Sequence, residues 1–252
     1  MSFQLDKMIN TCTAATRNDV SASNPSVSQG NADAMLHILR LVSPNQPVGG
    51  FSYSRGLEGA VHSNVVTDES SCSSWILGLL ESSYASLDGA LYWRMAKALL
   101  NGEETAFREL NDWLTASRES KELELEDRRM AESLLTVLAQ LGVQRAADFL
   151  TAERPSYPAA FAIAAHNWNV PPREALRGLM WSVVEGQVMA AIRLIPLGHM
   201  AGQRILIAAV PAIDAAVQKS CLLRDDEIGN VAPFMAMASA WHETQYSRLF
   251  RS

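Results

Sequence analysis

The stretch from Pro47 to Glu58, PVGGFSYSRGLE, gathers the residue types that most often do chemistry in a loop. Two adjacent glycines precede an aromatic residue, two serines and an arginine, and a third glycine follows. A phosphate-binding P-loop needs a lysine directly after its last glycine, but here Leu57 follows Gly56. A serine hydrolase elbow needs Gly-x-Ser-x-Gly after a strand, but here Ser replaces the last glycine and no strand pattern precedes it. The stretch therefore predicts neither a phosphate site nor a serine nucleophile.

Two interpretations of this loop remain open. In the first it is structural: its glycines, Gly50 among them, adopt positive φ, and Phe51 or Tyr53 fills the core. In the second, an exposed aromatic ring beside Arg55 forms a surface for a partner protein, because aromatic residues and arginine dominate binding hot spots.

Metal-binding patterns are incomplete. His242-Glu-Thr-Gln-Tyr246 half resembles the helical zinc-protease motif, but tyrosine stands where the second histidine ligand belongs. The five histidines are scattered singly, and the three cysteines are far apart and odd in number, which favours reduced thiols over disulfides or a zinc site. We predict no metal site and no cofactor.

The carboxylates offer two further candidates. Asp225, Asp226 and Glu227 could bind a hard cation, although three acids in a turn are more typical of a solvated helix cap. Glu185 lies in an apolar segment, where a carboxylate needs a partner or a wet cavity unless it faces solvent. Since no nucleophile converges with a base, an all-helical enzyme with its own active site is disfavoured.

Composition excludes several classes of protein. The chain has 252 residues, of which 48% are hydrophobic and 19% charged, as in an ordinary soluble protein. Its net charge of -6 argues against nucleic acid as a partner. Charges such as Arg193, Asp214 and Lys219 interrupt the apolar runs, and the first thirty residues lack the apolar region of a secretory signal. We expect a cytoplasmic protein with no membrane span.

The pattern of apolar residues predicts one all-α domain of roughly ten helices, bundle-like, over residues 31–252. Residues 1–30 are rich in Ser, Thr, Asn and Ala, which predicts a disordered tail. Beyond them apolar residues recur every three or four positions, with Asp68 and Asp88 as helix caps and Pro211 dividing or kinking a long helix. The expected helices are 33–42, one starting near 67 or 68, 89–100, 103–117, 122–141, 157–168, 172–195, 200–223 and one from about 233.

The C-terminal segment HETQYSRLFRS places Arg248 and Arg251 around Leu249 and Phe250. Chain ends fray by default, yet arginines alternating with aromatic and aliphatic anchors also suit a segment that becomes ordered on another protein. We therefore expect that deleting residues 244–252 leaves the fold intact and weakens partner binding.

Four segments together resemble the urease accessory protein F family: residues 39–58 (LRLVSPNQPVGGFSYSRGLE), 196–206 (PLGHMAGQRIL), 225–230 (DDEIGN) and 239–252 (SAWHETQYSRLFRS). The resemblance covers the chain from about Ala34 to its end, with the motifs in the family's order. Residues 102–155 carry no motif, and Trp241 stands where the family has a small or basic residue.

The resemblance implies a non-catalytic, homodimeric, all-helical chaperone of metallocentre assembly. Members of the family bridge the accessory protein D or H to the accessory GTPase G, and the resulting complex inserts nickel into apo-urease. The implied partner-binding residues lie in the loop, in the 196–206 segment and in the C-terminal segment: Phe51, Tyr53, Arg55, Glu58, His199, Gln203, Arg204, His242, Glu243, Gln245, Tyr246, Arg248, Leu249, Phe250 and Arg251.

An alternative from another class is a direct activator of the GTPase. Arginines can stabilise phosphoryl charge in trans, and Arg55 and Arg204 are the candidates for that role. A scaffold, by contrast, needs only to bind one state of the GTPase better than another.

Overall fold

The computed structural model describes the backbone of residues 25–230 and 232–252, and the side chains of 33–230 and 232–252. Most of the predicted tail, residues 1–24, lies outside the described residues. The regular elements of the described part are all helical, which confirms the all-α class. Residues Ala34–Ser252 form one compact unit, and the chain up to Asp33 is assigned to a separate one.

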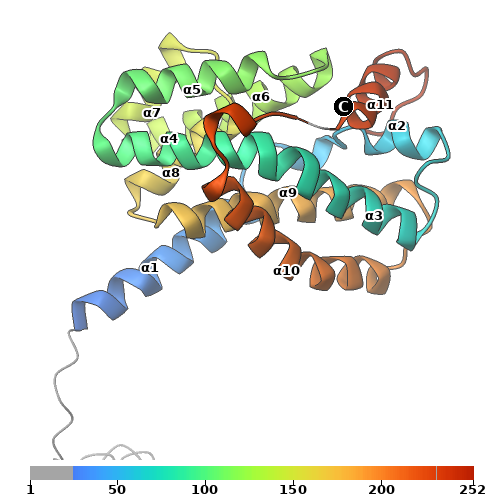
Figure 1. The fold of residues 1–252 in the computed structure, drawn as a ribbon, viewed down its shortest axis with the longest axis horizontal. Helices are drawn as coiled ribbons and strands as arrows, with labels where there is room; N and C mark the ends of the chain where they lie inside the picture. The colour runs from blue at the N-terminus through green and yellow to red at the C-terminus, as the bar shows by residue number, and fades with distance from the viewer. Residues whose placement is uncertain (1–24, 231) are drawn as a thin grey trace, which may run out of the picture. The chain divides into compact units, whose positions relative to one another are not determined.

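The predicted helices are present in their predicted order, but α2 and α7 were not predicted, and α1 begins at Pro25, inside the predicted tail and before its predicted start at Asp33. They are α1 (Pro25–Val42), η1 (Gly50–Ser52), α2 (Leu57–His62), α3 (Glu69–Leu79), η2 (Leu80–Asp88), α4 (Gly89–Asn101), α5 (Glu104–Ala116), α6 (Lys121–Gln140), α7 (Gln144–Ala152), α8 (Tyr157–Asn167), α9 (Pro172–Leu194), α10 (His199–Leu222), η3 (Asp225–Glu227) and α11 (Pro233–Glu243). Figure 1 shows the order in colour along the chain.

The core is built around α8, in which every residue from Tyr157 to Ala165 is buried. Its alanines are small enough for α4, α6 and α9 to pack closely against it. The hydroxyl of Ser156 caps the helix by accepting from the backbone N–H of Ala159. The apolar composition of this segment thus correctly predicted a central helix.

The chain from α3 to α4 is a single uninterrupted helical rod (Figure 1). Asp68 caps its start, as predicted, by accepting from the backbone N–H of Ser71 at 2.8 Å. The prediction that Asp88 caps a new helix is wrong, because residue 88 has helical backbone angles and its side chain makes no cap. The two α-helices are instead joined through η2, a π-helical segment.

The π-helical segment is tied to the C-terminal half of the chain. Lys219 Nζ donates to the carbonyl of Glu81 at 2.9 Å, and the hydroxyl of Ser220 donates to that of Ala85 at 2.9 Å. Since π-helical turns are rare and occur mostly as local departures from α-helix, contacts from outside the helix help to stabilise this one. α10 therefore packs against η2 as well as against its neighbour α9.

Helix α10 has an apolar surface on more than its core-facing side. It runs without a break through Pro211, so of the two predicted outcomes, a division or a kink, the division is wrong. Contrary to the expectation from its charges, α10 is long and apolar enough to cross a membrane, although core helices of soluble proteins pass the same test. Only 33% of its most apolar window is buried, and Met200, Ile207 and Leu222 are each about 70% exposed.

Candidate partner-binding surface

The loop before α2 is shaped by two glycines in left-handed conformations. Gly49 has φ 72° and Gly56 has φ 80°, values that side-chain-bearing residues rarely adopt. The expectation of positive φ at Gly50 is wrong, since its φ lies outside that region. Between the two glycines the loop turns once through η1, which leaves the ring of Phe51 72% exposed and Tyr53 buried.

The side chain of Arg55 points inward, so the expected pairing of an exposed aromatic with this arginine does not occur. Arg55 Nε donates to Glu126 Oε1 at 2.5 Å, and the guanidinium lies 5.5 Å from the centre of the Tyr84 ring. Burial is the largest single effect and lowers the pKa of Arg55, but Glu126, Tyr84 and Asp88 together outweigh it, and the pKa is raised well above its ordinary value.

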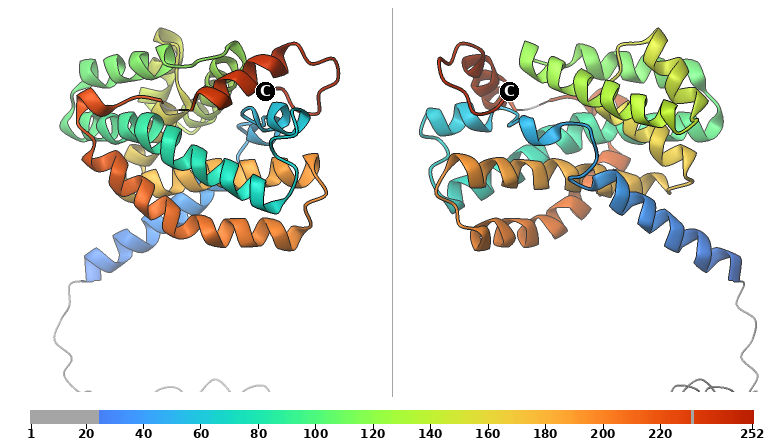
Figure 2. Two further views of the ribbon diagram at one scale, coloured as in Figure 1. Left: turned by 45° about the vertical axis from the view of Figure 1, so that its right-hand side comes forward. Right: turned by 180° about the vertical axis from the view of Figure 1, so that it is seen from behind.

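The C-terminal segment is folded onto this loop. The backbone N–H of Arg251 donates to the carbonyl of Ser52 at 2.8 Å, and that of Ser54 donates to the carbonyl of Ser252 at 2.9 Å. Ser252 is fully buried and its hydroxyl donates to Glu126 at 2.6 Å. Both views in Figure 2 place the C-terminus beside α2 and the preceding loop.

Two buried glutamates bind the C-terminal segment through hydrogen bonds. Glu58 on α2 accepts from the backbone N–H groups of Leu249 at 2.7 Å and Phe250 at 2.8 Å. Glu122 at the start of α6 accepts from Arg248 at 2.8 Å. Neither carboxylate is exposed, so each depends on these donors for its stability in the folded protein.

His242 lies between the same two glutamates. Its Nδ1 is 2.7 Å from Glu122 Oε2, its Nε2 is 3.1 Å from Glu58 Oε2, and its side chain is fully buried. Both ring nitrogens face carboxylates, and only the imidazolium form can donate from both. The geometry therefore favours a positively charged His242 that compensates the two buried glutamates.

Phe250 is the apolar anchor of the segment. Its ring is 5% exposed, and the guanidinium of Arg193 on α9 lies 4.7 Å from its centre. These contacts argue against the expectation that residues 244–252 can be deleted without harm to the fold. Residues 248–250 donate hydrogen bonds to Glu58 and Glu122, and the ring of Phe250 is buried. These contacts join distant parts of the chain, so only the tertiary structure reveals them.

The implied partner-binding residues fall into three groups. Tyr53, Arg55, Glu58, His242 and Phe250 point inward and support the surface. Several others are exposed around them, with Tyr246 fully exposed and Leu249 52% exposed. The exposed members at this place are Phe51, Glu243, Tyr246, Arg248, Leu249 and Arg251, and Gln245 is partly exposed.

The third group lies apart on α10. His199, Gln203 and Arg204 are exposed in the first turns of that helix. Arg204 is bound to Glu69 of α3 by two hydrogen bonds of 2.7 and 2.6 Å, and this carboxylate raises the pKa of Arg204. Arg204 is therefore held against α3, and this group does not form part of the surface at the loop.

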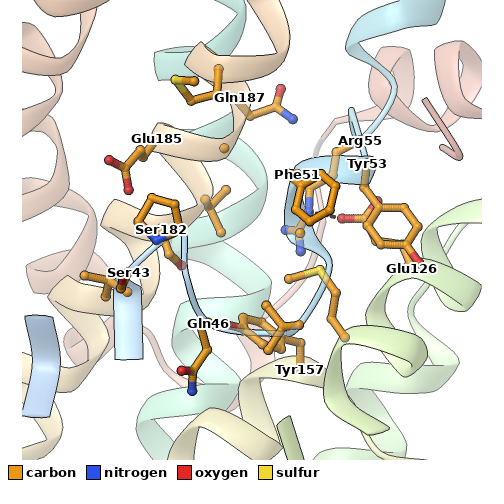
Figure 3. A pocket seen from close by; sticks show the side chains of 18 of the residues that line it. Ser43, Gln46, Phe51, Tyr53, Arg55, Glu126, Tyr157, Ser182, Glu185 and Gln187 are labelled. Atoms are coloured by element: carbon orange, nitrogen blue, oxygen red, sulfur yellow. Dashed lines mark hydrogen bonds and ion pairs between the residues drawn. The ribbon is translucent and has the colours of Figure 1, made fainter. Parts of the chain in front are cut away.

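A pocket lies between the loop and α9 (Figure 3). Glu185 lines it and is partly exposed, so it combines the two alternatives left open by the sequence, a cavity and a surface position, and burial raises the pKa of this carboxyl. Gln187 also lines the pocket, and its Nε2 donates to the carbonyl of Ser54 at 2.6 Å. No sequence pattern had singled out this residue.

A buried ionic network behind the loop was also missed. Arg118 pairs with Asp88 at 2.8 Å and with Asp127 at 3.1 Å, and Asp127 accepts from the backbone N–H of Tyr157 at 3.1 Å. Burial raises the pKa of Asp127 against the opposing effect of Arg118. Arg118 lies 9 positions from Asp127 and 30 from Asp88, and no spacing rule connects the three residues.

Comparisons with known proteins agree with the resemblance seen in the motifs. A model of the UreF family matches residues 66–210. The chain is 68% identical over 218 residues to "Urease accessory protein UreF 2" of Brucella anthropi, covering 86% of this chain and 96% of that protein. It is 38% identical to the UreF of Marinobacter nauticus, covering 92% of this chain and 100% of that protein. It is 43% identical to the UreF of Methylibium petroleiphilum, covering 88% and 95%. These matches confirm the predicted family: the chain belongs to the UreF family of urease accessory proteins.

Proposed function

We propose that this chain is a non-catalytic scaffold in urease maturation, which bridges the D/H accessory protein and the G-type GTPase so that nickel is inserted into apo-urease. The observation that carries the proposal is the surface made by the loop and the C-terminal segment. It presents Phe51, Tyr246 and Leu249 to solvent on a support of buried hydrogen bonds. Exposed aromatic and aliphatic groups on a rigid base are typical of binding hot spots.

Charge adds to the character of this surface. Among the described residues, Arg129 and Arg251 make no ion pair, and both line an open groove beside Gly49. A chain of net charge -6 that places unpaired arginines here favours a partner with acidic residues. The surface is thus suited to a protein partner that carries acidic residues.

A homodimer fits the other exposed apolar surface. The outer face of α10 presents Met200, Ile207 and Val210, the last 53% exposed, with no charge between them except Arg204, which is paired. A self-complementary apolar face is what a two-fold dimer requires. We propose that two copies meet through α10, which leaves the surface of the loop and C-terminal segment free for other partners.

The alternative, activation of the GTPase by an arginine in trans, has less support. Arg55 is buried and paired with Glu126, and Arg204 is held by both oxygens of Glu69. An arginine finger has to reach the phosphates of a partner, and each of these side chains would first have to break its ion pair. Replacing Arg55 would also leave Glu126 buried without its cation, so a loss of activity in that variant would report on folding.

The test is size-exclusion chromatography with light scattering on this chain alone, with its D-type partner, and with the GTPase added. The proposal predicts a dimer that takes up both partners. Phe51→Ala should weaken this uptake with an unchanged melting temperature, because the ring is exposed. Val65→Ala is the matched control, since Val65 is 45% exposed outside this surface. A well-folded chain that binds neither partner would overturn the proposal.

A further inference from the structure

An open groove runs between α6 and the loop before α2, and its volume is about 550 Å³. The residues that α6 contributes recur at three- and four-residue spacing, so they share one face of that helix. They are Arg129, Glu132, Ser133, Thr136, Val137 and Gln140. The opposite wall consists of Pro47, Val48, Gly49, Tyr53 and, from the C-terminal segment, Arg251. Each wall of the groove therefore carries one of the two arginines already described as unpaired.

The groove is positively charged although the chain is acidic. Arg129 and Arg251 are both exposed, so their guanidinium groups are accessible to a ligand. Among the described residues that line the groove, Glu132 is the one carboxylate, and Arg128 already pairs with it at 3.5 Å. Three guanidinium groups against one carboxylate leave a local charge of +2, whereas the whole chain has a net charge of -6. The groove therefore attracts anions, which the protein as a whole repels.

Unpaired arginines are concentrated at this place. Most arginines in the described part of the chain form ion pairs, and the exceptions there are Arg40, Arg129, Arg173, Arg193 and Arg251. Arg193 also lies at the loop, since its Nη1 donates to the carbonyl of Phe51 at 3.4 Å. Three of these exceptions thus lie beside one another in the fold, where they complement a partner of negative charge.

The shape and polarity of the groove suit a polypeptide better than a small anion. The hydroxyls of Ser133 and Thr136 donate to carbonyls of α6 at 2.8 and 2.7 Å, so their oxygens still have the capacity to accept an N–H group. From Arg129 to Gln140 the helix rises about 16 Å, which is the length of about five residues of an extended chain. Small ligands are bound by polar groups that converge in a concave site, whereas these arginines lie on opposite walls of an open groove.

We propose that this groove binds an extended acidic segment of a partner protein, with its carboxylates paired to Arg129 and Arg251 and its backbone N–H groups donated to the hydroxyls of α6. A guanidinium group can donate to both oxygens of a carboxylate, which makes acidic side chains its natural complement. The chain's own first 24 residues are not acidic, because two aspartates there are balanced by Lys7 and Arg17. The assignment of the segment to a partner rests on the proposed scaffold function; the affinity of the groove for an acidic peptide does not.

The first experiment uses the isolated full chain with a fluorescent peptide of alternating glutamate and serine. Fluorescence anisotropy at low ionic strength should show that this peptide binds and that added salt weakens the binding, because exposed charges are screened. A peptide of alternating glutamine and serine has the same length and lacks only the charge, and it should bind at least about tenfold more weakly. Absence of binding by the glutamate peptide, or equal binding of the glutamine peptide, would overturn the proposal.

Two arginine variants locate the site. Arg129→Gln and Arg251→Gln each remove one charge and keep a long polar side chain, and each should weaken binding of the glutamate peptide about threefold to fivefold, the range for an exposed ion pair. Arg173→Gln is the matched control, since Arg173 is exposed at the start of α9, lies outside the groove and has no ion pair among the described residues. It changes the net charge equally. Equal weakening by Arg173→Gln, or unchanged binding by Arg129→Gln, would overturn the location.

The last arm identifies the occupant of the groove. The unmodified chain, a double variant with Arg129→Gln and Arg251→Gln, and Arg173→Gln are each mixed with the D-type protein and the GTPase, and the complexes are measured by light scattering. The double variant should lose one partner by about tenfold in affinity, and Arg173→Gln should keep both. If the double variant takes up both partners normally, or loses only its own dimer, the assignment to a partner is wrong. If the unmodified chain binds neither partner, the scaffold function fails independently of the peptide result.

Discussion

His242 Nε2 lies 3.1 Å from Glu58 Oε2, although the two residues are 184 positions apart in the chain. Glu58 also accepts from two backbone N–H groups of the C-terminal segment, and the other nitrogen of His242 faces Glu122. One buried histidine thus compensates two carboxylates that together fix the end of the chain on the loop. The surface proposed for partners depends on this arrangement more than on any single exposed side chain.

Replacing His242 by alanine should destabilise the protein by about 2–4 kcal/mol, because it leaves two buried carboxylates without a shared donor. The free energy of unfolding, measured with a chemical denaturant, checks this. His199→Ala serves as the control, since His199 is exposed at the start of α10 and its loss should change stability by less than about 0.5 kcal/mol. Equal effects of the two substitutions would contradict the bridging role.

Phe250→Ala should cost about 3–5 kcal/mol, the usual range for removing a buried aromatic ring. Tyr246→Ala, four positions earlier, should have an effect within about 0.5 kcal/mol, because that ring is fully exposed. Denaturation of both variants measures the difference. A C-terminal segment that frays in solution would make the two variants equally stable.

Gly59→Ala should destabilise the contact between α2 and α11. A Cβ at residue 59 would lie 2.3 Å from the carbonyl oxygen of Ala238, so the two helices would have to separate. Overpacking of this kind costs about 1–3 kcal/mol. Gly78→Ala is the control, because that position has open space and alanine favours the helix by up to about 1 kcal/mol. The melting temperatures should therefore shift in opposite directions.

Stability should fall slightly as the pH drops below about 6.5 because of His166. Burial first, and the nearby Arg145 second, lower the pKa of this histidine below its ordinary value of 6.5. The unfolded chain then binds a proton at a higher pH than the folded one. The contribution of His166 is present above 6.5 and is lost as the pH falls through the lower folded value.

The measurement is the free energy of unfolding at pH 7.5 and 5.5 for the unmodified chain and for His166→Gln. Glutamine cannot be protonated, so the variant should lose less stability over this interval than the unmodified chain. The two proteins differ only at residue 166, so the contributions of all other groups cancel in the comparison. An identical pH dependence of the two proteins would rule out the depressed pKa.

The sequence by itself determined the all-α class, the central position of the apolar helix 157–167 and the family, because helical periodicity and local motifs are properties of neighbouring residues. Local signals gave a wrong prediction at Asp88. An aspartate before an apolar segment is typical of a helix cap, yet the helix continues through Asp88 as a π-helical segment.

Tertiary structure alone decided which residues of the candidate surface face solvent. Arg55 turned inward because Glu126, on a distant helix, supplies its counter-charge, and the C-terminal segment became part of the fold because Glu58 and Glu122 accept its donors. A buried charge is stable only beside its partner, and the partner is chosen by how the helices pack. That choice depends on contacts between positions 71 to 191 residues apart, which no local pattern in the sequence records.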